Sequence, residues 1–490
     1  MDDLRQNSSP RGWRGDGAPH LARSERMLHE SAKPRSGSAV LFGGDGMGLS
    51  QRQAPRLLSR ATSMKTLIRN GHLVDPKNKI DEPMDVLIEN GLVKKVAKKI
   101  SEKVDKEIDA TEKVVCPGLI DLHVHLRQPG YEYKETIQTG LRAAVKGGFT
   151  GVCPMPNTNP IADRRSDMEF LMGEAKRLSL IRIWPVGAVT LKQEGAELTE
   201  FGELKKGGAV ALSDDGRPIS DSNILRRALE YSKKFDLVIM VHCQDEGLFC
   251  GGCMNEGFVS TKLGLAGIPV ESESVEVARD IQLADLTGGR LHFCHISSKK
   301  SLDLIRQAKA QGSKVSAETC PHYFHLTDEA VLHYNTFAKM NPPLRTAEDV
   351  AAIKKSLKEG TLDAISTDHA PHSENEKNSE FDKAPFGIIG LETSLALSLK
   401  LVEEKVLTLS DLVRKMSLCP AEILKVDRGH LSEGAVADVT IFDPKEEWLV
   451  EKEKLESKSK NSPFLGWKLR GKASTVICDG RIVMKDGNLA

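Results

Sequence analysis

Polar and apolar residues alternate strictly over residues 120–127, which is the pattern of a β-strand with one buried face. One face carries Ile120, Leu122, Val124 and Leu126, and the other carries Asp121, His123, His125 and Arg127. The two imidazoles would lie about 6–7 Å apart along the strand, where both can bind a metal ion such as zinc. The guanidinium of Arg127 can bind a carboxylate through two parallel hydrogen bonds. A His-x-His pair also arises by chance, so its interpretation depends on the rest of the chain.

A second pattern, a short apolar strand followed by a helical stretch, repeats over residues 116–430. The eight candidate strands are 118–125, 149–154, 181–187, 208–213, 237–242, 290–296, 314–320 and 362–367. Eight alternating strand and helix units predict an α/β fold, a closed (β/α)8 barrel of the TIM type. An open doubly wound sheet is the alternative, but no glycine-rich nucleotide-binding loop follows the first strand.

Short strand patterns with turn signals occur at both ends of the predicted folded chain. The pairs Asn70-Gly71 and Asn90-Gly91 are strong hairpin signals. Residues 437–443 and 475–483 show a similar pattern of short strands. Neither end is long enough to bury a core alone. We therefore predict one small β-sandwich domain made of residues 64–115 and 431–490, which encloses the barrel of residues 116–430.

Residues 1–63 differ in composition from the rest of the chain. They are rich in Arg, Ser, Gly and Pro and show no sustained period, so we predict a disordered N-terminal extension. The segment lacks the basic start and apolar core of a secretory signal. An upstream-extended gene model is the favoured explanation, and a transit peptide is the alternative.

Bulk composition narrows the classes of partner. Lysine plus arginine equals aspartate plus glutamate, at 69 each, and no long basic run occurs, which disfavours nucleic acid. No apolar stretch approaches the ~20 residues needed to span a membrane. The nine scattered cysteines fit reduced thiols in a cytoplasmic protein. Cys250 and Cys253 form a CxxC pair that could hold a structural zinc ion, but no second pair is present.

Polar residues gather where the predicted strands end, which is where barrel enzymes carry their active sites. The strand ends contain His123, His125 and Arg127, then Asn157, Asp214 and Asp215, then His242, His295, Asp368, His369 and His372. Each of these has a structural alternative, such as a capping aspartate or a core histidine. So many histidines and aspartates at one end of one barrel nevertheless predict a catalytic metal site.

These segments resemble a known family. The stretches 121–127 (DLHVHLR), 155–160 (MPNTNP), 213–216 (SDDG), 341–345 (NPPLR) and 366–372 (STDHAPH) look like bacterial class I dihydroorotase, of the amidohydrolase superfamily. The resemblance covers residues 64–490, with the motifs in the family's order. It includes pieces of the split β-domain at 434–438 and 441–443.

The resemblance implies a role for each matched residue. His123, His125 and Asp368 would hold one metal ion, and Asp215, His242 and His295 would hold or share a second. The substrate would be bound by Arg127, Asn157, Asn341 and His372, with His125 and the backbone around Phe386 and Gly387. Asp368 would also be the catalytic base, taking a proton from water and returning it to the leaving nitrogen. Zinc is favoured, with one or two ions per chain, although manganese or cobalt could substitute.

The implied reaction is the reversible cyclisation of N-carbamoyl-L-aspartate to (S)-dihydroorotate in pyrimidine biosynthesis. A homodimer is the expected oligomer. A complex with aspartate transcarbamoylase is a further expectation, because the loop 369–386 could become ordered on contact with it. One alternative is a chain without activity that serves as a structural partner of that enzyme, but every inferred ligand is retained here.

Another cyclic amidase, a hydantoinase or allantoinase, is the alternative enzyme. Those relatives usually bridge two metal ions with a carboxylated lysine on strand four. The predicted strand at 208–213 contains no lysine, and Lys205 and Lys206 precede it, at the wrong end of the barrel. One departure from the dihydroorotase pattern is Gln128, which stands where an acidic residue is usual.

Overall fold

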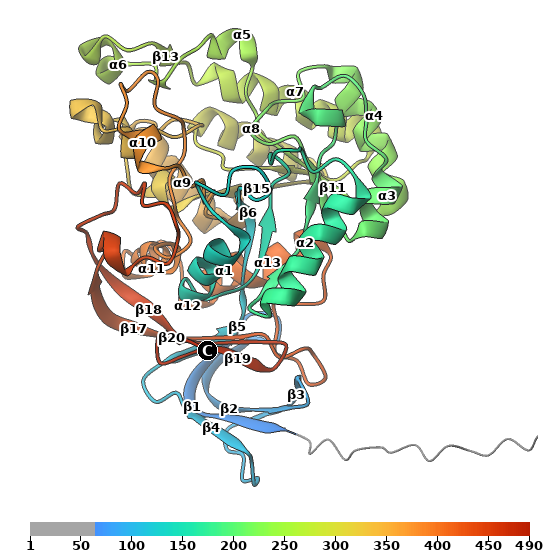
Figure 1. The fold of residues 1–490 in the computed structure, drawn as a ribbon, viewed down its shortest axis with the longest axis vertical. Helices are drawn as coiled ribbons and strands as arrows, with labels where there is room; N and C mark the ends of the chain where they lie inside the picture. The colour runs from blue at the N-terminus through green and yellow to red at the C-terminus, as the bar shows by residue number, and fades with distance from the viewer. Residues whose placement is uncertain (1–63) are drawn as a thin grey trace, which may run out of the picture. The chain divides into compact units, whose positions relative to one another are not determined.

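Parallel strands form a closed barrel in this computed structural model, which describes residues 64–490 (Figure 1). The predictions for residues 1–63 lie outside the described residues. The barrel strands are β6 (Leu119–Val124), β7 (Phe149–Pro154), β8 (Arg182–Ile183), β9 (Val186–Gly187), β10 (Ala211–Ser213), β11 (Val238–Val241), β14 (Leu291–Phe293), β15 (Val315–Thr319) and β16 (Ala364–Ile365). A parallel bridge between Val124 and His369 joins the last strand to the first. The predicted TIM-type barrel is confirmed, with each strand inside its expected range.

The third barrel strand is divided into β8 and β9 by Trp184 and Pro185. Proline has no N–H to donate to a ladder, so the assigned strand stops there. The path is nevertheless continuous, because Trp184 N donates to Val152 O at 2.9 Å and Val210 N donates to Pro185 O at 3.0 Å.

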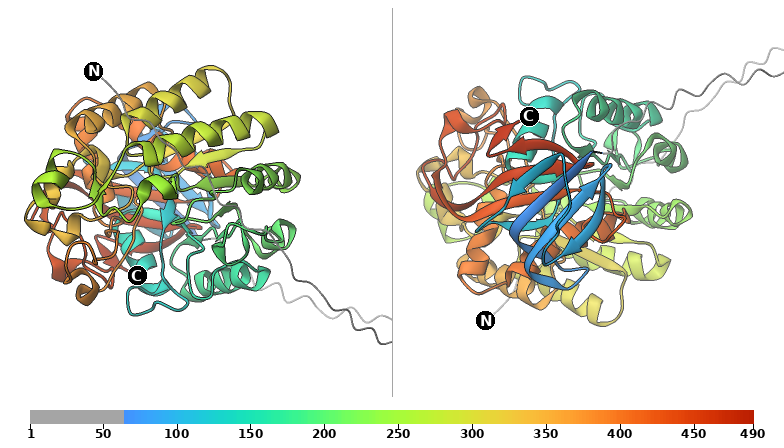
Figure 2. Two further views of the ribbon diagram at one scale, coloured as in Figure 1. Left: turned by 90° about the horizontal axis from the view of Figure 1, so that it is seen from above. Right: turned by 90° about the horizontal axis from the view of Figure 1, so that it is seen from below.

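Helices cover the outside of the barrel (Figure 2, left). The main ones are α1 (Ile137–Lys146), α2 (Arg165–Leu178), α3 (Phe201–Gly207), α4 (Ser222–Ser232), α7 (Glu271–Thr287), α8 (Lys299–Ala310), α9 (Ala347–Glu359) and α11 (Ser394–Glu403). Shorter helices are α5 (Glu246–Phe249), α6 (Phe258–Leu263), α10 (Glu374–Lys377), α12 (Leu409–Val413) and α13 (Cys419–Leu424). Helix α1 shows how local sequence sets a helix. Thr136 caps its first turn by accepting from Thr139 N, and Ile137 and Leu141 lie on its buried face.

The two ends of the described chain share one nine-stranded sheet below the barrel (Figure 2, right). Its strands are β1 (Lys65–Asp75), β2 (Ile80–Glu89), β3 (Leu92–Ala97), β4 (Lys106–Asp109), β5 (Val114–Pro117), β17 (Val439–Leu449), β18 (Lys468–Cys478), β19 (Arg481–Lys485) and β20 (Asn488–Leu489). Strand β5 joins the halves, since it pairs with β1 on one side and β17 on the other. A core including Ile68, Val115 and Ile441 is buried between them. A two-stranded sheet of β12 (Met254–Asn255) and β13 (Gly267–Ile268) lies in the loops above the barrel.

The apolar face predicted for the first barrel strand is divided between two cores. Ile120 and Leu122 pack in a cluster with Met240, whereas Val124 and Leu126 belong to the larger cluster that includes the helices. The pairing of β6 with β7 shifts register between Asp121 and Val124. Such irregularities change the direction of side chains next to active sites. They explain why the side chains of this strand do not alternate strictly between two faces.

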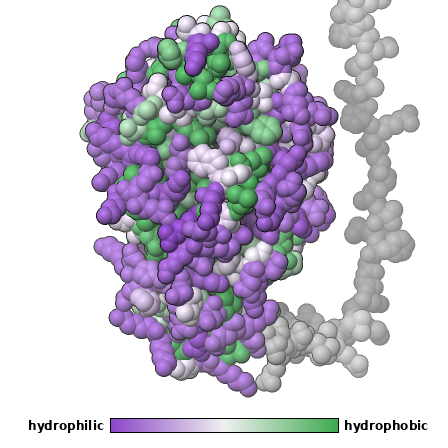
Figure 3. Space-filling view, turned by 90° about the vertical axis from the view of Figure 1, so that its left-hand side faces the viewer, coloured by the Kyte–Doolittle hydropathy of each residue, from purple (hydrophilic) through white to green (hydrophobic). Residues whose placement is uncertain are grey.

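The face drawn in Figure 3 is covered mainly by hydrophilic side chains, with apolar ones scattered among them. Within residues 64–490, no helix combines the length and the apolar character needed to cross a membrane.

Candidate active site

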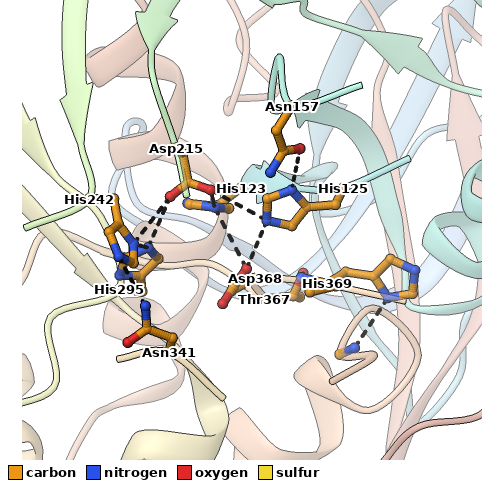
Figure 4. A network of polar contacts seen from close by, with 12 residues as sticks. His123, His125, Asn157, Asp215, His242, His295, Asn341, Thr367, Asp368 and His369 are labelled. Carbon is orange, nitrogen blue, oxygen red and sulfur yellow. Dashed lines mark hydrogen bonds and ion pairs between the residues drawn. The ribbon is translucent and has the colours of Figure 1, made fainter. Parts of the chain in front are cut away.

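The carboxyl ends of the barrel strands surround a cavity of about 350 Å³. All predicted site residues except His123 line it: His125, Arg127, Asn157, Asp215, His242, His295, Asn341, Asp368, His372, Phe386 and Gly387. His123 is fully buried beside them and contacts Asp215 (Figure 4). Residues from all along the barrel sequence therefore meet at one mouth, as the position of the strand ends predicts.

His123, His125 and Asp368 form one half of the cluster. The Oδ1 atom of Asp368 lies 3.1 Å from His125 Nε2 and 3.6 Å from His123 Nε2. One ligand atom from each of the three residues falls within 4.8 Å of the others. The histidines end β6 and the aspartate follows β16, so the closure of the barrel brings them together.

Asp215, His242 and His295 form the other half. The Oδ1 atom of Asp215 lies 3.1 Å from His295 Nε2 and 3.6 Å from His242 Nδ1. The two imidazoles face each other at 3.1 Å, between His242 Nδ1 and His295 Nε2. These residues follow the neighbouring strands β10, β11 and β14.

Asp215 lies between the two halves. Its Oδ2 atom is 3.3 Å from His123 Nε2 and 3.5 Å from His125 Nε2, while Oδ1 faces the other pair of histidines. The neighbouring Asp214 turns away and accepts hydrogen bonds from Val189 N at 2.8 Å and Thr190 N at 3.0 Å. Asp215 therefore presents one oxygen to each pair of histidines and could be shared if both halves held a metal ion, whereas Asp214 holds a loop.

The donor set fits a divalent metal ion. It combines buried imidazoles with carboxylates, the ligands that zinc prefers besides thiolate. Burial favours the neutral form of Asp215, but His123 and the other histidines hold the pKa of Asp215 well below its ordinary range. His123 Nε2, which faces Asp215 and Asp368, is buried without a hydrogen-bond partner, which is unusual unless another group binds there. The CxxC pair Cys250 and Cys253 is absent from the groups of described residues that could hold a metal ion.

Three site residues have backbone conformations that are uncommon outside glycine. The φ angle is +61° at Arg127, +35° at His295 and +46° at Asp368. Positive φ is sterically unfavourable for residues with a Cβ and persists where the surrounding structure enforces it. Each of these residues ends or follows a barrel strand, so the strained backbone directs its side chain into the cavity.

Neighbouring groups set the orientation of the imidazoles. Asn157 Oδ1 lies 2.9 Å from His125 Nδ1 and can accept its proton, and Nε2 on the other side of the ring lies 3.1 Å from Asp368 Oδ1. The carboxylate Glu318 Oε1 lies 3.4 Å from Nδ1 of His123. Such outer partners fix the tautomer of a metal-binding histidine. Asn157, expected to bind substrate, thus also holds His125.

Sequence reasoning missed two residues behind the histidines. Gln244 Oε1 lies 3.4 Å from His242 Nε2 and accepts from Asn341 Nδ2 at 2.5 Å. Gln244 stands two positions after His242. The two-residue period of a strand places both side chains on the same face, so the sequence could have identified Gln244. Glu318 was also detectable, as a charged residue inside the predicted buried strand 314–320.

Cationic groups surround His372 at one end of the cavity. Arg127 Nη2 lies 3.3 Å from His372 Nε2, and Lys134 Nζ lies 3.2 Å from His372 Nδ1. Burial and these two cations hold the pKa of His372 well below its ordinary value, so the ring is neutral. Arg127 also donates from Nε to Pro371 O at 3.1 Å. This end of the cavity suits an anionic ligand, and Lys134 is a contributor that the sequence did not reveal.

A segment between β17 and β18 supports the loop that closes the cavity. Asn461 Nδ2 donates to Gly387 O at 3.0 Å and to Ala370 O at 3.1 Å, and Asn461 Oδ1 accepts from His372 N at 3.1 Å. Gly387 has φ +125°, and a Cβ there would lie 2.7 Å from Ala370 Cβ. Residues 450–467, predicted only as part of the small β-domain, thus reach the active-site loops.

Comparison with known proteins identifies the family. The model of the family described as "Dihydro-orotase-like" matches residues 112–301. Dihydroorotase of Geobacter metallireducens is 54% identical over 423 residues, which are 86% of this chain and 100% of that protein. Dihydroorotase of Geotalea daltonii is 55% identical, also over 86% of this chain and 100% of that protein.

Solved structures agree on the fold. L-hydantoinase (dihydropyrimidinase) from Arthrobacter aurescens superimposes with a TM-score of 0.77 at 24% identity, over 87% of this chain and 97% of that one. A dihydropyrimidinase from Brevibacillus agri has the same TM-score at 23% identity, over 87% and 96% of the two chains. These distant neighbours share the barrel and the β-sandwich. From the identity to its dihydroorotase relatives, the chain belongs to the dihydroorotase family.

Proposed function

We propose that this protein is a metal-dependent dihydroorotase, which interconverts N-carbamoyl-L-aspartate and (S)-dihydroorotate plus water in pyrimidine (UMP) biosynthesis. Relatives more than half identical over 86% of the chain carry that activity in their names. The observation that carries the proposal is the convergence of two groups of histidines on Asp215, next to the cationic end formed by Arg127. The substrate is an anionic cyclic amide, so it needs both parts.

The metal proposal rests on the two halves of the cluster. His123, His125 and Asp368 would hold one ion, and His242 and His295 a second, with Asp215 shared. A metal ion held by these residues supplies Lewis acidity, which acidifies a water molecule and polarises a carbonyl oxygen. Zinc is the proposed ion, because it matches imidazole and carboxylate ligands.

The proposed substrate contacts derive from charge and position. Arg127 binds the substrate carboxylate, aided by Asn157, and His372 lines the same end of the cavity. Asn341 and the backbone at Phe386 and Gly387 contact the ring from the opposite loop. Holding the ring in one orientation converts binding energy into rate.

Asp368 is the proposed base. Burial alone would raise its pKa, but the neighbouring His125 and His123 outweigh burial and hold the pKa of Asp368 well below its ordinary value. An ionised carboxylate can accept the proton of the attacking water during hydrolysis and return it to the leaving ring nitrogen. In the direction of synthesis the same group removes a proton from the attacking nitrogen.

A substrate panel tests this function. The purified chain with added zinc should turn over dihydroorotate and N-carbamoyl-L-aspartate, and leave hydantoin and allantoin unchanged. The described strand four, Ala211–Ser213, contains no lysine that could be carboxylated, and Asp215 occupies the position between the two groups of histidines. Preferential hydrolysis of hydantoin would contradict the proposal.

Arg127→Met should raise KM for dihydroorotate by about 100-fold with a smaller fall in kcat, since it removes a charge-assisted contact that also exists in the bound ground state. Steady-state kinetics measures both constants. Arg142→Met, on the outer helix α1 where Arg142 pairs with Glu456, is the control and should change neither constant. A fall in kcat at unchanged KM would contradict the assignment of Arg127 to substrate binding.

The chain itself holds its active-site loop. The ammonium of the fully buried Lys377 donates to Thr336 O at 2.9 Å, Lys339 O at 3.2 Å and Pro385 O at 2.8 Å. Lys377→Met removes all three hydrogen bonds and leaves Thr336 O and Lys339 O with only their backbone donors, Lys339 N and Gly387 N, so we expect loss of stability and a rise in KM of about tenfold. Thermal unfolding and kinetics measure the two effects. Unchanged constants would show that Lys377 does not hold the loop.

The assembly and subclass are also proposals. We propose a class I enzyme that acts in the cytoplasm as a homodimer. A complex with aspartate transcarbamoylase stays a prediction, and the internal contacts of Lys377 favour a loop that does not depend on that partner. Kinetics with and without added transcarbamoylase test this, because a partner-dependent loop predicts a large gain in kcat on mixing.

A further inference from the structure

Glu318 is a buried carboxylate to which the proposed reaction gives no role. It lies on β15 with 0% of its surface exposed. Its Oε1 atom lies 3.4 Å from Nδ1 of His123, and its Oε2 atom lies 3.3 Å from Nε2 of His292. The hydroxyl of Ser366 also donates to Oε2. Removing a carboxylate from water is costly, so a buried one calls for an explanation.

His123 presents its two ring nitrogens to different groups. Nε2 faces the carboxylates of Asp215 and Asp368, at 3.3 and 3.6 Å, where the proposed metal ions would lie. Nδ1 faces Glu318 on the other side of the ring. Among the described residues, neither Nδ1 of His123 nor Oε1 of Glu318 has a hydrogen-bond partner, and the two atoms face each other at 3.4 Å.

We propose that Glu318 is a positioning residue for metal binding: its carboxylate keeps the proton of His123 on Nδ1 and so directs the lone pair of Nε2 toward the metal. A metal ion binds only the ring nitrogen that carries no proton. A carboxylate behind a metal-binding histidine fixes the tautomer and makes the imidazole a stronger ligand. The inference rests on the proposed metal-dependent function and adds a determinant of metal affinity to it.

The surroundings of Glu318 leave one oxygen for His123. The hydroxyl of Ser316 lies 2.8 Å from Nδ1 of His292, and Nε2 on the other side of that ring lies 3.3 Å from Glu318 Oε2. Ser366 donates to the same oxygen. With Oε2 occupied from two sides, Oε1 is held in place opposite the ring of His123.

The two histidines of β6 are therefore supported differently. His125 donates to the neutral amide oxygen of Asn157 at 2.9 Å, whereas His123 faces a carboxylate. A charged acceptor polarises an imidazole more than a neutral one does. Loss of Glu318 should consequently weaken metal binding even though Glu318 itself does not touch the cavity.

Glu318→Gln, which keeps the shape and removes the charge, tests the inference. We expect zinc affinity to fall by about 10- to 100-fold, measured by competition with a chromophoric chelator at one fixed pH. Excess zinc should restore part of kcat with KM little changed, and Glu318→Asp should recover part of the affinity. The control is Glu392→Gln, a half-buried glutamate that accepts from Glu456 N and Ser457 N at 3.0 and 3.1 Å. It should bind zinc as the wild type does.

The outcomes separate this inference from the proposed function. Wild-type protein that binds zinc and turns over dihydroorotate, with Glu318→Gln of equal zinc affinity, would overturn the inference and leave the function intact. Wild-type protein that binds no zinc and is inactive would overturn both. If Glu318→Gln does not fold, Ser366→Ala provides the test. It removes a hydrogen bond to Oε2 of Glu318, so zinc binding should weaken several-fold. Zinc affinity equal to that of the wild type would refute the inference.

A metal ion inside this buried group is the competing explanation. His123, Cys294 and Glu318 also have ligand atoms within 4.8 Å of one another. Cys294→Ala discriminates, because it removes a ligand of that alternative site and none of the positioning contacts. We expect unchanged zinc stoichiometry by elemental analysis, and loss of one equivalent would overturn the positioning role.

Discussion

Replacing Asp368 by asparagine should lower kcat for dihydroorotate by about 1000-fold or more, with KM changed only a few-fold. Asparagine keeps the shape of the side chain but cannot accept a proton, and general base catalysis contributes about 10²- to 10⁴-fold. Asp368 also lies 3.1 Å from His125 Nε2 among the proposed metal ligands, so zinc content must be measured beside the rate. Steady-state kinetics at saturating zinc separates the two effects.

The control for this experiment is another buried aspartate. Asp280 on α7 is 1% exposed, pairs with Arg279 at 2.7 Å and is not among the residues that line the cavity. Asp280→Asn should reduce stability more than turnover. If Asp368→Asn retained near-normal kcat with full zinc content, the base would have to be another group.

Replacing Asp215 by asparagine should remove at least one equivalent of zinc and almost all activity. Its two oxygens face different pairs of histidines, with Oδ2 3.3 Å from His123 Nε2 and Oδ1 3.1 Å from His295 Nε2. A neutral amide in this position leaves four imidazoles with a single carboxylate, Asp368, to balance the positive charge of the metal. Elemental analysis and chelator competition measure the loss.

The adjacent aspartate provides a closely matched control. Asp214 is buried, and its pKa is raised to about 6 by burial, which the hydrogen bonds from Thr190 oppose. Asp214→Asn should destabilise the loop at residues 189–190 and leave the zinc content unchanged. If instead Asp214→Asn lost zinc and Asp215→Asn retained it, the assignment of the two carboxylates would be reversed.

Local pattern was sufficient for the elements of the barrel. The eight apolar stretches separated by helical patterns correspond to the barrel strands, because strand and helix periodicities are properties of neighbouring residues. The sequence pattern predicts the third strand, 181–187, as one element, although Pro185 divides it into two assigned strands in the structure. The prediction that the two ends of the chain form one small β-domain agrees with the pairing of β5 and β17.

The sequence alone determined which residues gather at the mouth of the barrel. His123, His242, His295 and Asp368 all lie at or just after the ends of parallel strands, and the carboxyl ends of parallel strands meet at one face. That rule requires no knowledge of long-range contacts. The choice of Asp215 over Asp214, by contrast, depended on resemblance until the backbone showed which side chain turns inward.

Only the tertiary structure decided what stands behind those residues. Glu318, Gln244 and Asn461 hold ligands or loops through contacts between strands and segments that are far apart in the chain. Residue spacing indicates the face on which a side chain lies but not its partner across the barrel. The register shift in β6 and the positive φ of Asp368 are likewise products of closure, since the surrounding structure enforces conformations that local sequence disfavours.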